Sequence, residues 1–167
     1  MKKLSIVILI STFSLLTQAQ SYQTAVGVRF GNVAGARAGG AGLNLKHFLS
    51  EKNALELTLG GGANHIRAQL LYEWQNPTNI TDGLDWYIGV GGGLGLWSVS
   101  VNLPGTNNYS ESGMFLGVDG VVGLDWNLES QTDIPLSVAI DLGPHIGLIN
   151  SNRVGWGSAL ALRYIFK

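Results

Sequence analysis

The sequence predicts an all-β fold, an eight-stranded antiparallel up-and-down transmembrane β-barrel, and three observations support this prediction. Apolar residues alternate with small or polar residues in eight segments, with the period of two that separates the two faces of a β-strand. Only 13% of the 167 residues are charged, while 46% are hydrophobic, and a soluble domain has about 25% charged residues. The residues opposite the apolar face are dominated by glycine, alanine and isolated charges.

The first 19 residues have the pattern of a cleavable secretory signal peptide. Lys2 and Lys3 precede an apolar run over residues 4–16, and Thr17 and Ala19 place small residues at the −3 and −1 positions of a cleavage site. A membrane anchor is the alternative, but the run is shorter than the roughly 20 apolar residues of a spanning helix. We therefore expect export, cleavage after Ala19, and one barrel domain over residues 20–167.

The alternation is clearest in residues 136–148, where Val138, Ile140 and Leu142 share one face and Ala139 and Asp141 share the other. The same period marks seven further segments, namely 26–30, 43–46, 55–59, 65–75, 84–98, 114–128 and 156–166. The connections are short, which makes adjacent segments antiparallel hairpins. They are predicted at 31–38, 49–53, 60–64, 76–83, 99–112, 128–134 and 149–152.

The small and polar parity is assigned to the barrel interior. A soluble lipocalin-like barrel would instead turn this parity to water and fill it with Lys, Glu and Thr, whereas glycine weakens a water-facing strand. Eight strands leave an interior just wide enough for side chains to fill, which small residues make possible. Charges away from water must pair, so we expect a stabilising interior network, with a narrow polar path for a small solute as the alternative. Its predicted members are Arg29, Lys46, Arg67, Arg163, Glu56, Glu73, Asp85, Asp119, Asp125 and Asp141.

Aromatic residues provide a second sign of a membrane. If the first strand starts in the periplasm, five aromatic residues fall at the periplasmic ends of later strands, on the parity that faces lipid. Aromatic girdles of this kind mark the interfaces of membrane barrels, whereas a soluble barrel has no reason to gather them at one rim. The predicted periplasmic girdle consists of Trp74, Trp86, Trp126, Tyr164 and Phe166.

Several stretches carry a resemblance to a known family: GLNLKHFLSEKNALE (42–56), LLYEWQNP (70–77), GLDWYIGVGGGLG (83–95), GVDGVVGLDW (117–126), DIPLSVAIDLGPHIGL (133–148) and ALALRYIF (159–166). They resemble the small outer-membrane β-barrels of Bacteroidota-type bacteria, whose architecture is like that of OmpX and the membrane domain of OmpA. The resemblance implies a Gram-negative outer membrane, contact with its lipid, and recognition by the barrel assembly machinery of a terminal aromatic residue. Phe166 would fill that role, although Lys167 follows it.

Catalytic signatures are lacking in the sequence. The chain has no cysteine, which excludes disulfides, thiol catalysis and a lipidated cysteine. The three histidines are His47, His65 and His145, and Asp141 lies about 13 Å from His145 along one strand, too far for the Asp–His hydrogen bond of a catalytic triad. We find no metal-binding motif and no phosphate-binding loop, and thus expect no metal and no cofactor.

These observations favour a monomeric integral outer-membrane protein without enzymatic activity, which supports the envelope or presents its loops to a partner. The net charge of −1 gives no basic patch for nucleic acid. Three alternatives stay open: a small channel or a barrel that binds an apolar solute, an enzyme that modifies outer-membrane lipid, and a soluble secreted lipocalin-like barrel.

Overall fold

The computed structural model describes residues 22–32, 39–101, 109–150 and 154–166. The predicted signal peptide, residues 102–108 of the predicted loop, and Lys167 lie outside the described residues. The described part of the chain contains eight strands, β1 (Thr24–Asn32), β2 (Gly40–Phe48), β3 (Asn53–Gly62), β4 (His65–Pro77), β5 (Leu84–Val101), β6 (Tyr109–Asn127), β7 (Leu136–Ile149) and β8 (Gly155–Phe166).

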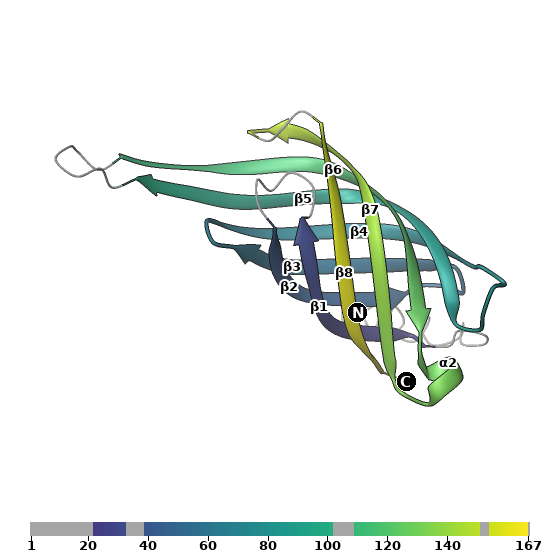
Figure 1. Cartoon of the computed structure of the whole chain (residues 1–167). Helices are drawn as coiled ribbons and strands as arrows, with labels where there is room; N and C mark the ends of the chain where they lie inside the picture. Colours follow the sequence, from purple (N-terminus) through teal and green to yellow (C-terminus); the bar gives the residue numbers. More distant parts are fainter. Residues whose placement is uncertain (1–21, 33–38, 102–108, 151–153, 167) are drawn as a thin grey trace, which may run out of the picture.

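Each strand pairs antiparallel with the next, and β1 pairs with β8, so the sheet closes into a barrel (Figure 1). The register of the closing pair runs from Thr24 opposite Phe166 to Asn32 opposite Ser158. Closure leaves no free sheet edge around this part of the wall. The prediction of an all-β, eight-stranded antiparallel up-and-down barrel is confirmed. No helix in the described part of the chain is long and apolar enough to cross a membrane.

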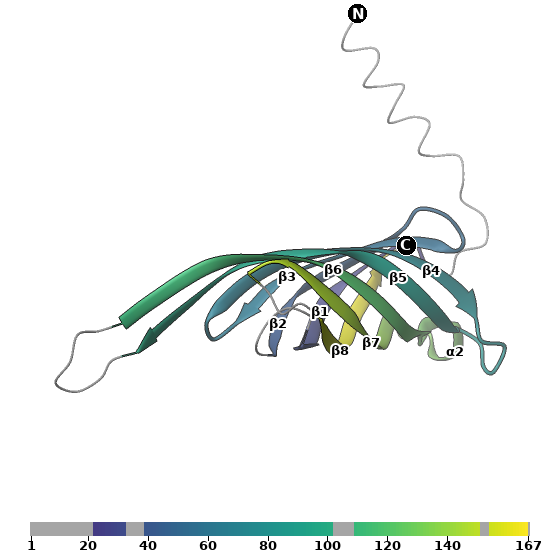
Figure 2. The same ribbon diagram turned by 90° about the horizontal axis from the view of Figure 1, so that it is seen from above.

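The two ends of the barrel differ. One, here called the α2 end, holds the connections β2–β3, β4–β5 and β6–β7, the last of which contains the four-residue helix α2 (Glu129–Thr132). The other, here called the hairpin end, is where the paired strands β5 and β6 extend far beyond their neighbours. Figure 2 shows this long hairpin at the opposite side of the molecule from α2.

The predicted connection 99–112 was too long. The ladder of β5 and β6 continues to the pair Val101–Tyr109, so the connection is confined to residues 102–108. Serine stands on both strands here, and the hydroxyls of Ser100 and Ser110 lie 3.4 Å apart. The parity that carries Leu94 and Leu96 continues as Ser98 and Ser100, so the apolar pattern by which the strand was predicted stops before the strand ends. Similarly, the predicted connection 60–64 shortens to two residues, Ala63 and Asn64.

The wall has an apolar outer face and a polar inner face. In β7, Ile140 is 58% exposed, whereas its neighbours Ala139 and Asp141 are buried inside the barrel. Interior glycines create the room for large inner side chains. A Cβ atom at Gly123 would lie 2.6 Å from the Tyr87 ring, and one at Gly117 would lie 2.0 Å from the His145 ring. Glycines on the inner face thus leave space for the larger side chains that share this face.

Candidate functional site: the polar interior of the barrel

The ten charged residues that the sequence assigns to the interior all lie on the inner face of the wall. Nine are buried, and Asp85, near the α2 end, is half-buried. They come from every strand, since alternate residues of each strand point inward. Seven form a central network and Asp119 belongs to a second group nearer the hairpin end. Asp85 accepts a hydrogen bond from Gln75 over 2.9 Å, and Arg67 is buried on the inner face of β4.

Two arginines and one glutamate form the centre of the network. The Glu56 carboxylate accepts hydrogen bonds from the guanidinium groups of Arg29 and Arg163, and from the Asn44 amide at 3.1 Å. Arg29 also donates to Asp141 over 2.7 Å. The Tyr87 hydroxyl donates to the other oxygen of Asp141 over 2.9 Å. Planar guanidinium groups suit this role, because each can serve two carboxylates at once.

Lys46 joins a second set of carboxylates to this centre. Its ammonium group lies 2.8 Å from an Asp125 oxygen and 2.9 Å from a Glu73 oxygen. Asp125 also accepts a hydrogen bond from Ser137 at 2.5 Å and lies 3.4 Å from Arg163. A fully buried ammonium group carries a large desolvation penalty, which only several close partners can offset. The network therefore binds β2, β4, β6 and β8 together through the interior.

The second group lies closer to the hairpin end and consists of Gln69, Asp119 and His145. His145 Nδ1 is 2.6 Å from one oxygen of Asp119, and the Gln69 amide donates to the other oxygen over 2.7 Å. Position along one strand led us to consider only Asp141 as a partner for His145, and the contact with Asp119 was missed. The signal was available: pairing segment 114–128 with segment 136–148 through their short connection places Asp119 opposite His145, as the register shows.

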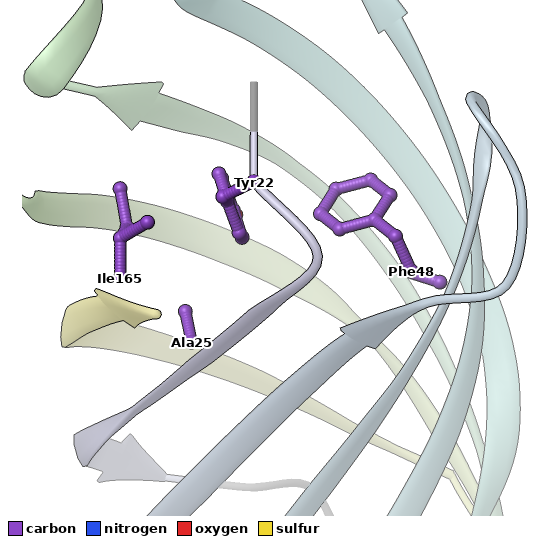
Figure 3. Packing of buried hydrophobic residues seen from close by; sticks show 5 residues of the cluster. Tyr22, Ala25, Phe48 and Ile165 are labelled. Carbon is purple, nitrogen blue, oxygen red and sulfur yellow. The ribbon is translucent and has the colours of Figure 1, made fainter. Parts of the chain in front are cut away.

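An apolar layer lies inside the barrel at the α2 end. Figure 3 shows Tyr22, Phe48 and Ile165 pointing toward one another inside the barrel, and the rings of Tyr22 and Phe48 meet edge-on with centroids 5.1 Å apart. The Tyr22 hydroxyl donates to Asp125 at 3.3 Å. Burial and the Asp125 charge raise the pKa of this phenol, so it stays protonated and keeps its donor role. Tyr22 precedes β1, and no strand pattern in the sequence marked it.

Side chains fill the interior between these groups. The inner cavity beside Arg29, Gln69, Asp119 and Asp141 has a volume of about 10 Å³, which is room for about one water molecule. In the described part of the chain, no group of three or more His, Asp or Glu side chains could hold a metal ion. The chemistry that this arrangement supports is mutual neutralisation of buried charges.

The five aromatic residues predicted to form a girdle lie on the outer face at the α2 end. Their exposed fractions run from 39% to 50%. The rings of Tyr164 and Phe166 meet edge-on at 5.0 Å, and that of Trp74 meets Tyr72 at 4.8 Å. Five aromatic rings therefore lie on the outer face at this end of the barrel, four of them with the polar N–H or O–H group of Trp or Tyr.

Comparison with known proteins supports the fold and goes no further. No protein-family profile and no curated protein sequence matches the chain. Among solved structures, the chain is similar to the N-terminal β-barrel domain of Pseudomonas aeruginosa OprF, with a TM-score of 0.61 and 16% sequence identity. The similarity covers 89% of this chain and 100% of the OprF domain. At this identity the match shows a shared barrel architecture.

Proposed function

We propose that this chain is an integral outer-membrane β-barrel of a Gram-negative, Bacteroidota-type bacterium, and that it supports the envelope or presents loops without enzymatic activity. The observation that carries the proposal is the inverted surface of the barrel: large apolar side chains cover the outside while charged side chains are buried inside. In water this arrangement would expose an apolar area far larger than the patches of soluble monomers. An apolar outer face of this kind is stable in contact with lipid, as in transmembrane β-barrels.

The proposed topology rests on a first strand that starts in the periplasm, the side from which an exported chain arrives. The α2 end, with the outer aromatic residues and the end of β8, faces the periplasm, and the hairpin end faces the cell exterior. Export by the signal peptide, insertion by the barrel assembly machinery and a monomeric state belong to the same proposal. The similarity in fold to the barrel domain of OprF supports the architecture on which it depends.

A channel is the less favoured alternative because ion pairs and the apolar layer fill the interior. Planar-bilayer recordings of the refolded chain separate the two functions. We expect no stepwise conductance from the wild-type protein, and regular single-channel steps would establish the channel instead.

Refolding tests the membrane location directly. The chain over residues 20–167 is diluted from urea into buffer with and without lipid vesicles, and the β signal in circular dichroism is followed together with gel mobility. We expect a heat-modifiable, compact band only with lipid or detergent, and fractionation of cells should find the protein in the outer membrane. A compact, monomeric β-protein in detergent-free buffer would contradict the proposal.

A further inference from the structure

The small cavity inside the barrel lies between the central network and the second group. Its volume of about 10 Å³ is close to the minimum that one water molecule needs. Its lining includes four charged or amide side chains, each from a different strand: Arg29 of β1, Gln69 of β4, Asp119 of β6 and Asp141 of β7. The cavity therefore touches both polar groups of the interior.

Two polar atoms of this lining have hydrogen-bonding capacity that the protein does not use. Nη1 and Nη2 of Arg29 donate to Glu56 and Asp141, whereas its Nε is buried without a hydrogen-bond partner among the described residues. The Gln69 amide nitrogen donates to Asp119, which fixes the orientation of the amide. Its Oε1 is likewise buried and has no partner in the described part of the chain. Arg29 is 2% exposed and Gln69 is 3% exposed, so bulk water does not reach these atoms.

We infer that this cavity binds one structural water molecule, which accepts a hydrogen bond from Arg29 Nε and donates one to Gln69 Oε1. Buried polar groups need partners, and here the two groups are a donor and an acceptor, which one water molecule can serve together. Its second hydrogen can be donated to a carboxylate oxygen of Asp119 or Asp141, which line the same cavity. The water then makes the three hydrogen bonds that are typical of buried water in proteins.

Other occupants suit the cavity less well. A metal cation cannot accept the hydrogen bond that Arg29 Nε offers, and the guanidinium charge would repel it. A ligand of several heavy atoms exceeds the volume of about 10 Å³.

The bound water would connect two strands that are not neighbours in the sheet. Arg29 belongs to β1, which pairs with β2 and β8, and Gln69 belongs to β4, which pairs with β3 and β5. Arg29 is part of the central network and Gln69 is part of the second group. The water molecule therefore links the two groups across the interior. This inference concerns the interior alone and does not depend on the proposed function.

A crystal structure of the chain over residues 20–167, refolded in detergent and determined at a resolution that shows ordered water, tests the inference directly. We expect one peak of electron density at hydrogen-bond distance, about 2.7–3.2 Å, from both Arg29 Nε and Gln69 Oε1. Crystals soaked in thallium(I) should show no anomalous signal at this position. Absence of the peak, a peak that contacts only one of the two atoms, or an anomalous signal from a bound cation would overturn the inference.

A matched pair of variants tests the same water in solution, where magnetic relaxation dispersion of the solvent counts the water molecules that stay inside the protein. Val121 lines the cavity, so the added methyl group of Val121→Ile should displace the water, and we expect one long-lived water fewer than in the wild type. Val122→Ile makes the same change at the adjacent position on the outer face, where the side chain is 47% exposed, and should leave the number unchanged.

Heat-modifiability gels verify that both variants are folded. Equal numbers of long-lived waters in the wild type and in Val121→Ile would also overturn the inference. If Val121→Ile does not fold, the crystal structure of the wild type decides the question alone. Neither measurement depends on the cellular location of the protein.

Discussion

The inner and outer faces of the barrel wall obey opposite rules, although they alternate along the same strands. In β8, Arg163 is fully buried, while its neighbours Leu162 and Tyr164 are 44% and 50% exposed. Inside, each side chain is held by specific partners, so geometry decides what it contributes. Outside, side chains are largely exposed to the surrounding solvent, so polarity decides. The comparison teaches that one residue type should have different effects on the two faces.

The largest effect is expected from replacing a central charge. Arg163→Met removes the guanidinium that contacts Glu56, Asn44 and Asp125, and leaves their polar atoms short of partners in a buried site. Breaking a buried ion pair by removing one partner costs about 3–5 kcal/mol. We expect the free energy of unfolding, measured by urea titration in lipid vesicles, to fall by that amount.

Leu162→Met is the matched control, since it brings the same new residue to the adjacent position on the outer face. A volume-conserving apolar exchange costs less than about 1.5 kcal/mol, and here the side chain faces solvent rather than a packed core. Similar losses in the two variants would show that the two faces do not differ as described.

An intermediate effect is expected in β7. Ile140 lies on the outer face, in the middle of the strand, and an arginine that faces lipid near the bilayer midplane costs about 2–4 kcal/mol. Ile140→Arg should lower the unfolding free energy in vesicles accordingly. Ala139→Thr places extra volume beside Tyr87 and Ala161 in the interior, so its cost should come from crowding, about 1–3 kcal/mol. If the Ile140→Arg variant were as stable as the wild type, the outer face at this position would not be in contact with lipid.

Alternation alone was enough to predict the fold, because a period of two assigns each residue to a face without any knowledge of partners. It also separated the ten interior charges from the outer residues, since a slip by one residue would reverse every side chain. The outer aromatic residues followed from the same parity plus the order of the hairpins. These predictions needed only local pattern and the short connections.

Features that depend on contacts between strands could not be predicted from the alternation within single segments. The pair Asp119–His145 requires the register of β6 against β7, and the inner apolar layer depends on Tyr22, which lies before any strand. The extension of β5 and β6 to Val101 and Tyr109 escaped detection because the apolar pattern by which the strands were predicted stops before the strands end.

The smallest effect on stability is expected at the end of β8, where Phe166 faces outward and is not packed in a core. Phe166 is half-exposed at the α2 end, and Phe30 has nearly the same exposure on β1 near the hairpin end. Because neither ring is buried in a core, Phe166→Ala and Phe30→Ala should have similar, small effects on unfolding in vesicles, about 1 kcal/mol or less. In cells the two should differ. If the assembly machinery reads the terminal aromatic residue, Phe166→Ala should lower the amount of folded, heat-modifiable barrel in the outer membrane, while Phe30→Ala should not. Equal amounts of folded protein for both variants would show that Phe166 is an ordinary member of the outer face.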